Sequence, residues 1–187
     1  LFQKRSSEKR RKFNRLGLFV SSGYLVITLL LKGIAYQKFT QALEVQQIAY
    51  TAIDTRPAPF NTILWSANID TEDAYLIANY SFFDSKPIQF DSYPKNHQLL
   101  GSLETNDKIQ RLMKIAEGWF IISEEDQQLY FSDLRFGLMS VDAKGENFAF
   151  KYQLTNEQGD LEILETPRSV GDAKNLLSAL WDRIWGN

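Results

Sequence analysis

The residue types that could do chemistry in this chain are few. Its 187 residues include one histidine, His97, and no cysteine. A cysteine nucleophile is therefore excluded, and a zinc site would have to be built almost wholly from carboxylates, which suit zinc poorly. No serine lies in a G-x-S-x-G context. We interpret His97 as a loop residue and assign neither catalytic nor metal-binding residues to this chain.

Asp133 and Arg135, in the segment LYFSDLRFG, form the most informative charged pair. Residues two apart share one face of a strand, so the two side chains are expected to be neighbours. Two interpretations stay open: an ion pair that braces the strand, or an anion-binding arginine positioned by its aspartate. The second leads to the hypothesis of a binding pocket with four candidate residues: Lys95, His97, Asp133 and Arg135.

Other motifs do not predict a ligand site. Glu124, Glu125 and Asp126 are consecutive acidic residues, but they lack the spacing of a calcium loop. We interpret them as a solvated hairpin tip. The glycines are scattered and form no phosphate-binding loop.

Charge is distributed unevenly along the chain. Residues 1–15 hold seven basic residues and one acidic residue, a local charge of +6, whereas the whole chain has a net charge of −2. The longest apolar run, Leu16–Tyr36, follows this basic arm directly, and Leu16–Leu31 contains no charge. The run predicts a membrane-spanning helix through which the protein contacts a membrane. Basic residues flank such helices on the cytoplasmic side, so the rest of the chain is expected on the opposite side.

Alternatives to the membrane span stay open. Ser21, Ser22, Gly23 and Thr28 dilute the apolar run, so a helix that lies on the membrane or packs on the body is the competing interpretation. Binding of the basic arm to nucleic acid is disfavoured, because the acidic remainder would repel phosphate. Since the chain begins at Leu1 and not at methionine, we expect it to be a piece of a longer protein.

Hydrophobic periodicity predicts a long helix followed by an α+β body. Residues 16–50 are expected to form one helix, first apolar and then amphipathic. Residues 51–187 read as short strands joined by turns, with helical spacing at 105–116 and 169–185. The prediction for this body is an antiparallel sheet with two helices packed on it.

The two halves of the long helix carry different expectations. Leu16–Leu31 should present an apolar surface that the body does not cover. Phe39, Leu43 and Ile48 should pack against the sheet. Two prolines in Arg56–Pro59 predict extended or turn geometry after the helix.

Several segments of the chain carry a family resemblance. They are RPAPFNTILW (Arg56–Trp65), YPKNHQLL (Tyr93–Leu100), LYFSDLRFG (Leu129–Gly137) and LWDRIWG (Leu180–Gly186), with the apolar helix before them. In these segments the chain resembles the carboxyl-terminal part of bacterial inner-membrane metal-dependent hydrolases, a family described as LexA-regulated or LexA-binding.

The resemblance implies where the chemistry of such a protein would lie. The family's metal-binding histidines belong to an upstream membrane region with a motif similar to H-R-G-x-T-H-S, which this chain lacks. Residues 1–187 would then be a membrane helix and an extramembrane tail domain at a bacterial inner membrane, partnered by upstream membrane helices. The full-length protein would be a hydrolase with a divalent metal held upstream, and this piece alone would hold no cofactor and be non-catalytic. The alternative is a membrane-anchored module that binds a ligand or a protein and has no hydrolase role.

Overall fold

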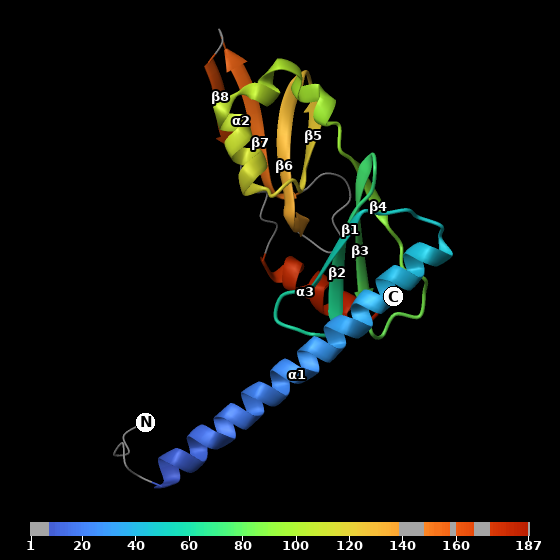
Figure 1. The fold of residues 1–187 in the computed structure, drawn as a ribbon, viewed down its shortest axis with the longest axis vertical. Helices are drawn as coiled ribbons and strands as arrows, with labels where there is room; N and C mark the ends of the chain where they lie inside the picture. The colour runs from blue at the N-terminus through green and yellow to red at the C-terminus, as the bar shows by residue number, and fades with distance from the viewer. Residues whose placement is uncertain (1–7, 139–147, 158–159, 167–172, 187) are drawn as a thin grey trace.

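The structure, a computed structural model, describes residues 8–138, 148–157, 160–166 and 173–186. A long N-terminal helix leads into two antiparallel sheets of four strands each, with further helices packed on them (Figure 1). The expected α+β class is therefore confirmed. In chain order the elements are α1 (Glu8–Val45), β1 (Ala52–Pro57), β2 (Leu64–Asp70), β3 (Ala74–Ser81), β4 (Asp91–Pro94), η1 (His97–Thr105), α2 (Asp107–Ile115), β5 (Phe120–Glu125), β6 (Gln128–Leu138), β7 (Phe148–Glu157), β8 (Asp160–Glu165) and α3 (Ala173–Ile184).

The strands form two sheets where the sequence suggested one. Sheet A has the order β1-β2-β3-β4 and sheet B the order β5-β6-β7-β8. The chain passes from one to the other through η1 and α2. Alternation of apolar and polar residues identifies a strand but does not say which strand pairs with it, so the division was not visible in the sequence.

The two halves of α1 differ as expected. Phe39 and Leu43 are fully buried against sheet A, and Ile48 packs at the margin of the same cluster. The large apolar residues from Phe13 to Leu30 are exposed, and only 6% of the most apolar 18-residue window is buried. α1 is thus long and apolar enough to cross a membrane, while its C-terminal half belongs to the folded body.

The chain termini extend beyond what the structure describes. Residues 8–15 of the basic arm form the first turns of α1, whereas residues 1–7 lie outside the described residues. The final helix begins at Ala173 in the described part of the chain, and 169–172 of the expected helix lie outside it.

One strand was not expected. β1 covers the segment before the two prolines and pairs antiparallel with β2, with Pro57 opposite Trp65 at its last position. β1 lies at the edge of sheet A. An edge position tolerates proline because the missing N–H does not break a ladder between two partners.

Sheet B packs against α2 on one face and contacts sheet A with the other. Ile109 and Ala116 lie on Phe120, Phe131 and other residues of sheet B. The side chain of Asn106 caps α2 by accepting the backbone N–H of Lys108. The β5–β6 hairpin turns at Asp126 and Gln127, both with positive φ, as a two-residue hairpin loop requires. The acidic residues of this turn are exposed, which confirms the solvated hairpin tip.

A third apolar cluster joins the two sheets. It contains Tyr75 and Ile77 of sheet A with Ile121 and Leu134 of sheet B. The Nδ2 of Asn68, a buried residue, donates to the backbone carbonyl of Leu134 at 2.8 Å. The sheets are thus held by both packing and a buried hydrogen bond.

α3 covers the face of sheet A that α1 leaves free. α1 packs on the face that carries Trp65 and Ala67, while Leu180 and Ile184 of α3 pack on Leu64 of the other face. The two helices expected on the body therefore cover different sheets, α2 on sheet B and α3 on sheet A. Between α3 and β6, part of this second face of sheet A is left uncovered.

Candidate functional site

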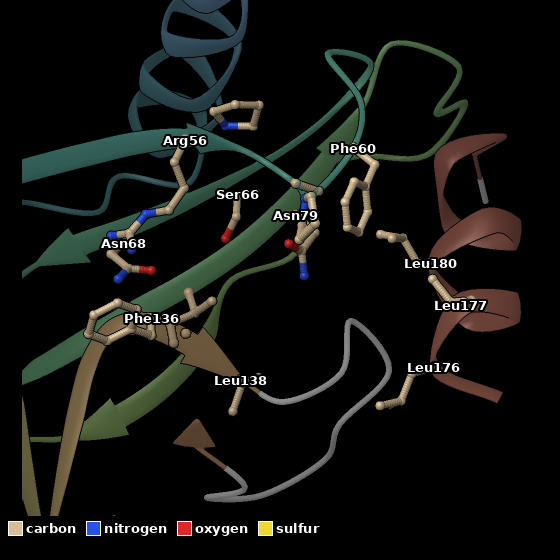
Figure 2. Close-up of a pocket in the computed structure, with 15 residues that line it drawn as sticks. Arg56, Phe60, Ser66, Asn68, Asn79, Phe136, Leu138, Leu176, Leu177 and Leu180 are labelled. Carbon is tan, nitrogen blue, oxygen red and sulfur yellow. The ribbon is translucent and has the colours of Figure 1, made fainter. Parts of the chain in front are cut away.

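The uncovered part of sheet A forms the floor of a pocket of about 310 Å³. Its floor is made by β2 and β3, one wall by the end of β6, and the opposite wall by α3, as Figure 2 shows. The segment from Arg56 to Phe60 closes a third side. Most of the lining is apolar: Pro57, Ala58, Pro59, Phe60, Ile77, Phe136, Leu138, Leu176, Leu177 and Leu180.

Three polar side chains line the floor of this apolar pocket. Ser66, Asn68 and Asn79 come from β2 and β3. Ser66 and Asn79 point into the space between β6 and α3 (Figure 2). Asn68 already donates to Leu134. An apolar pocket with a few convergent polar groups is the usual form of a small-molecule site, in which the polar groups orient the ligand.

A bulge in β6 shapes the first wall. The pairing of β6 with β7 shifts register between Asp133 and Leu138, and Gly137 has a φ of 69°. Bulges bend a strand and redirect its side chains. Here the bend brings Phe136 and Leu138 over sheet A.

The second wall is fixed by polar contacts at the C-terminal end of α3. Arg183 forms two hydrogen bonds with the carboxylate of Asp84, at 2.6 and 2.7 Å, and a third to the carbonyl of Asn79. The side chain of Asp84 is only 3% exposed. The hydroxyl of Ser81 donates to the carbonyl of Ile184. A buried bidentate pair of this kind fixes both position and angle of the helix.

The third side is a loop organised by Asn61. The side-chain amide of Asn61 donates to the carbonyl of Pro59, and its oxygen accepts the backbone N–H groups of Ile63 and Leu64. This bracing holds Phe60 at a φ of 62°, unusual for a bulky residue. Phe60 is 96% exposed at the mouth of the pocket.

Arg56 is the charged residue of the lining. Its Nη2 lies 2.8 Å from Oδ2 of Asp54, and both side chains are substantially exposed. An exposed ion pair of this kind contributes about 0–1 kcal/mol, so little free energy holds the guanidinium there. Arg56 is thus available to an anionic group in the pocket.

Among the sequence-predicted candidates, Asp133 and Arg135 are brought together. Nη2 of Arg135 lies 2.7 Å from Oδ2 of Asp133, Nε lies 3.2 Å from both carboxylate oxygens, and the backbone N–H of Arg135 donates to Oδ1. Glu117 lies 3.4 Å from Nη1. The hydrogen bond with Asp133 raises the pKa of Arg135 above its ordinary value. These contacts make the pair a brace between β6 and the turn after α2.

Lys95 contacts a different part of the molecule. Its ammonium lies 2.8 Å from Oδ1 of Asp70, donates to the carbonyls of Thr71 and Glu72, and lies 5.0 Å from the ring centre of Tyr75. The hydroxyl of Tyr75 donates to the carbonyl of Gly118, across the junction between the sheets. Burial, with a smaller contribution from Asp70, raises the pKa of Tyr75 to about 12.

His97 opens η1 and packs on sheet B. Its ring stacks on Phe120 at 4.1 Å, and Nε2 lies 2.8 Å from the carbonyl of Phe120. Because a carbonyl only accepts, Nε2 must carry the proton. The lining residues of the pocket include none of Lys95, His97, Asp133 and Arg135.

The residues that do line the pocket were not singled out from the sequence. A signal was present in β2, where Ser66 and Asn68 alternate with Trp65 and Ala67. Such alternation is usually interpreted as a solvent-facing side of a strand. Here that side is covered by β6 and α3, so the polar groups lie in a cavity.

Metal ligands do not gather in the described part of the chain, which contains no group of three or more His, Cys, Asp or Glu side chains placed to hold an ion. Comparison of the chain with protein-family models, with curated proteins and with solved structures finds no match. The fold and the pocket define the class: an α+β domain with an exposed apolar helix and an apolar pocket with a polar floor.

Proposed function

We propose that this protein is a membrane-anchored ligand-binding domain. Its ligand would have an apolar body and a polar or anionic end. The observation that carries the proposal is the pocket, in which apolar walls from β6 and α3 face a floor with the hydroxyl of Ser66 and the amide of Asn79. The apolar walls supply most of the binding free energy, and the polar groups select the orientation.

Arg56 is the residue assigned to the anionic end. It lines the pocket and is held only by the exposed pair with Asp54. A guanidinium binds carboxylate or phosphate oxygens in a planar, two-pronged geometry. A medium-chain carboxylic acid is the simplest molecule with both properties.

The anchor in this proposal is the exposed half of α1. A helix of a globular core would be mostly buried, but Leu16–Leu30 faces away from the body. The 38 residues of α1 extend about 57 Å at 1.5 Å per residue, longer than the hydrocarbon layer of about 30 Å. In this proposal the basic residues at the start of α1 lie in the cytoplasm, as the positive-inside rule favours, and the body lies on the non-cytoplasmic side of a bacterial inner membrane.

The resemblance to membrane-bound metal-dependent hydrolases extends the proposal to the full-length protein. Three of the four resembling segments supply the lining residues Arg56–Phe60, Phe136–Gly137 and Leu180, so they meet at the pocket. In this form of the proposal the domain presents a ligand to a hydrolase site with a divalent metal in upstream membrane helices. The pocket itself supplies binding and not the reaction.

Photocrosslinking tests the binding. The full chain in phospholipid nanodiscs is irradiated with a diazirine-bearing dodecanoic acid, and labelled peptides are mapped by mass spectrometry. Labelling is expected on the peptides that contain Leu138 and Leu176–Leu180, and unlabelled dodecanoic acid should compete with it. Labelling of α1 peptides from the lipid phase provides the internal reference.

Matched variants sharpen the test. Ser66→Leu fills the floor and should reduce pocket labelling about tenfold relative to α1, as expected for a loss of about 1.4 kcal/mol in binding. Ser92→Leu makes the same change at an exposed position of β4 and should leave labelling unchanged. Arg56→Met should reduce labelling by the acid but not by the corresponding primary amide. The proposal would be contradicted if pocket labelling were unchanged in Ser66→Leu, or if excess unlabelled acid did not compete with it.

A further inference from the structure

Five exposed apolar side chains border the pocket and the end of α3. The set comprises Phe60, Phe83, Leu177, Trp181 and Trp185, and is called here the aromatic surface. The two tryptophans are 60% and 56% exposed. The ring of Trp185 stacks on Phe83 at 5.3 Å and contacts Trp181 edge to face at 5.7 Å. The rings are therefore held in a fixed arrangement although they are exposed.

The aromatic surface lies at the end of sheet A from which α1 leaves the body, where β1 and β3 finish. β1 begins shortly after α1 ends and runs back along it, so the N-terminal half of α1 emerges at the end of sheet A where β1 finishes (Figure 1). Phe60 follows that strand end directly. Phe83 follows the end of β3, and Trp185 is held there by the contacts of Arg183 and Ser81.

The composition of the surface fits one environment. Tryptophan and other aromatic side chains concentrate where lipid headgroups meet hydrocarbon, because their rings are apolar with a polar edge. On the exposed side of α3, Leu177, Trp181 and Trp185 share one stripe, whereas Ser178 and Asp182 lie beside it. A helix with such a stripe can lie in a membrane interface.

We propose that the aromatic surface docks on the interfacial layer of the bilayer that α1 crosses. This inference rests on the proposed membrane anchoring, because α1 brings this edge of the body to the bilayer. Phe60 and Leu177 belong to both the pocket lining and the aromatic surface. The pocket therefore opens toward lipid, and its ligand can enter from the membrane without crossing bulk water.

Spin labelling tests the docking on the full chain in nanodiscs of phosphatidylcholine and phosphatidylglycerol. Because the chain has no cysteine, single-cysteine variants label at one site. Ser178→Cys reports on α3, Val26→Cys on the exposed half of α1, and Glu124→Cys on the hairpin of sheet B that lies far from α1 (Figure 1). The measurement is the accessibility of each nitroxide to oxygen and to a water-soluble nickel chelate.

The expected result is a lipid-like label at position 26, an interfacial label at 178 and an aqueous label at 124. Trp181→Gln with Trp185→Gln should raise nickel accessibility several-fold in the Ser178→Cys chain and should leave the label of the Val26→Cys chain lipid-like. A lipid-like label at 26 with an aqueous label at 178 would overturn the docking and keep the anchor. An aqueous label at 26 would overturn the anchor and the docking together. If the tryptophan substitutions left the label at 178 unchanged, the role of the aromatic surface would be overturned.

Discussion

Two Asp-x-Arg ion pairs on strands differ in burial, and we expect them to differ in how much they contribute to the stability of the fold. Asp133 and Arg135 lie on β6, with the aspartate side chain 6% exposed. Asp54 and Arg56 have the same spacing on β1, at an exposed edge. A buried carboxylate that loses its partner is still shielded from water, so the free-energy cost of its desolvation remains. An exposed carboxylate that loses its partner is hydrated instead, and little stability is lost.

We therefore expect Arg135→Ala to destabilise the fold by about 1–3 kcal/mol, because Asp133 stays buried with only a backbone N–H donor from that residue. Arg56→Ala, the matched control, should change stability by about 0–1 kcal/mol. Thermal unfolding of the full chain in detergent, followed by circular dichroism, measures both. Equal effects of the two substitutions would show that burial does not distinguish the pairs.

At this scale the sequence was informative only about neighbours along the chain. The two-residue period of a strand was enough to place Asp133 beside Arg135. The partners of Lys95 were not predictable, because Asp70 and the turn carbonyls come from a different strand end. His97 was interpreted as a loop residue, but its ring stacks on Phe120 of β5, a contact across 23 positions that local sequence does not reveal.

The two halves of α1 have different surroundings. Its C-terminal half buries Phe39 and Leu43 in the core of sheet A, and its N-terminal half exposes every large apolar side chain from Phe13 to Leu30. The change falls near Leu31, which packs at the margin of the core cluster. Sequence periodicity predicted this division because the spacing of apolar residues changes from continuous to helical.

The corresponding prediction compares two phenylalanines of one helix. Phe39→Ala should destabilise the full chain in detergent by about 3–5 kcal/mol, through lost burial and a cavity against Trp65 and Tyr80. Phe19→Ala should leave the unfolding transition unchanged, because that side chain packs on no other described part of the folded body. Chemical denaturation monitored by tryptophan fluorescence measures the difference. A large effect of Phe19→Ala would mean that the N-terminal half packs on protein.

Pairing between elements was less predictable than the elements themselves. Most strands and helices have bounds close to those that alternation predicted, yet the segment of β1 was expected only as extended or turn geometry, and the strands were assigned to one sheet. Proline statistics cannot tell an edge strand from a turn, and register depends on contacts distant in sequence.

On the scale of the whole molecule, the junction between the sheets depends on a few buried groups. Tyr75 donates to Gly118 and packs on Trp119 at 5.3 Å. Its raised pKa makes this junction sensitive to alkaline pH. The folded-state pKa, about 12, lies above the ordinary value of 10.0, so the contribution to stability is fully present below pH 10 and lost as pH rises toward 12.

Comparison with Tyr75→Phe tests this effect, because phenylalanine keeps the ring and removes the ionisable hydroxyl. At neutral pH the substitution should cost about 0.5–1.5 kcal/mol for the lost hydrogen bond. Between pH 10 and 12 the stability advantage of the unsubstituted chain should shrink. Urea unfolding of both chains across this range measures it, and an advantage that stays constant with pH would show that Tyr75 does not ionise differently in the folded state.

The pocket is a property of the whole molecule and was not predictable from any one segment. Its floor, its two walls and its closing loop come from four separate parts of the chain. Each part alone reads as an ordinary amphipathic strand, helix or turn. The bulge in β6 shapes one wall of the pocket, and the ion pair between Arg183 and Asp84 fixes α3 as the opposite wall.

The attachment of α3 to sheet A also has a consequence for synthesis on the ribosome. Ser81 and its partner Ile184 are 103 residues apart, so the helix that covers one face of sheet A is made long after the sheet itself. At about 5–20 residues per second, translation leaves that face open for roughly 5–20 s. During this interval the floor of the pocket and the apolar residues around it are exposed, and a chaperone or the membrane surface would have to shield them until α3 emerges.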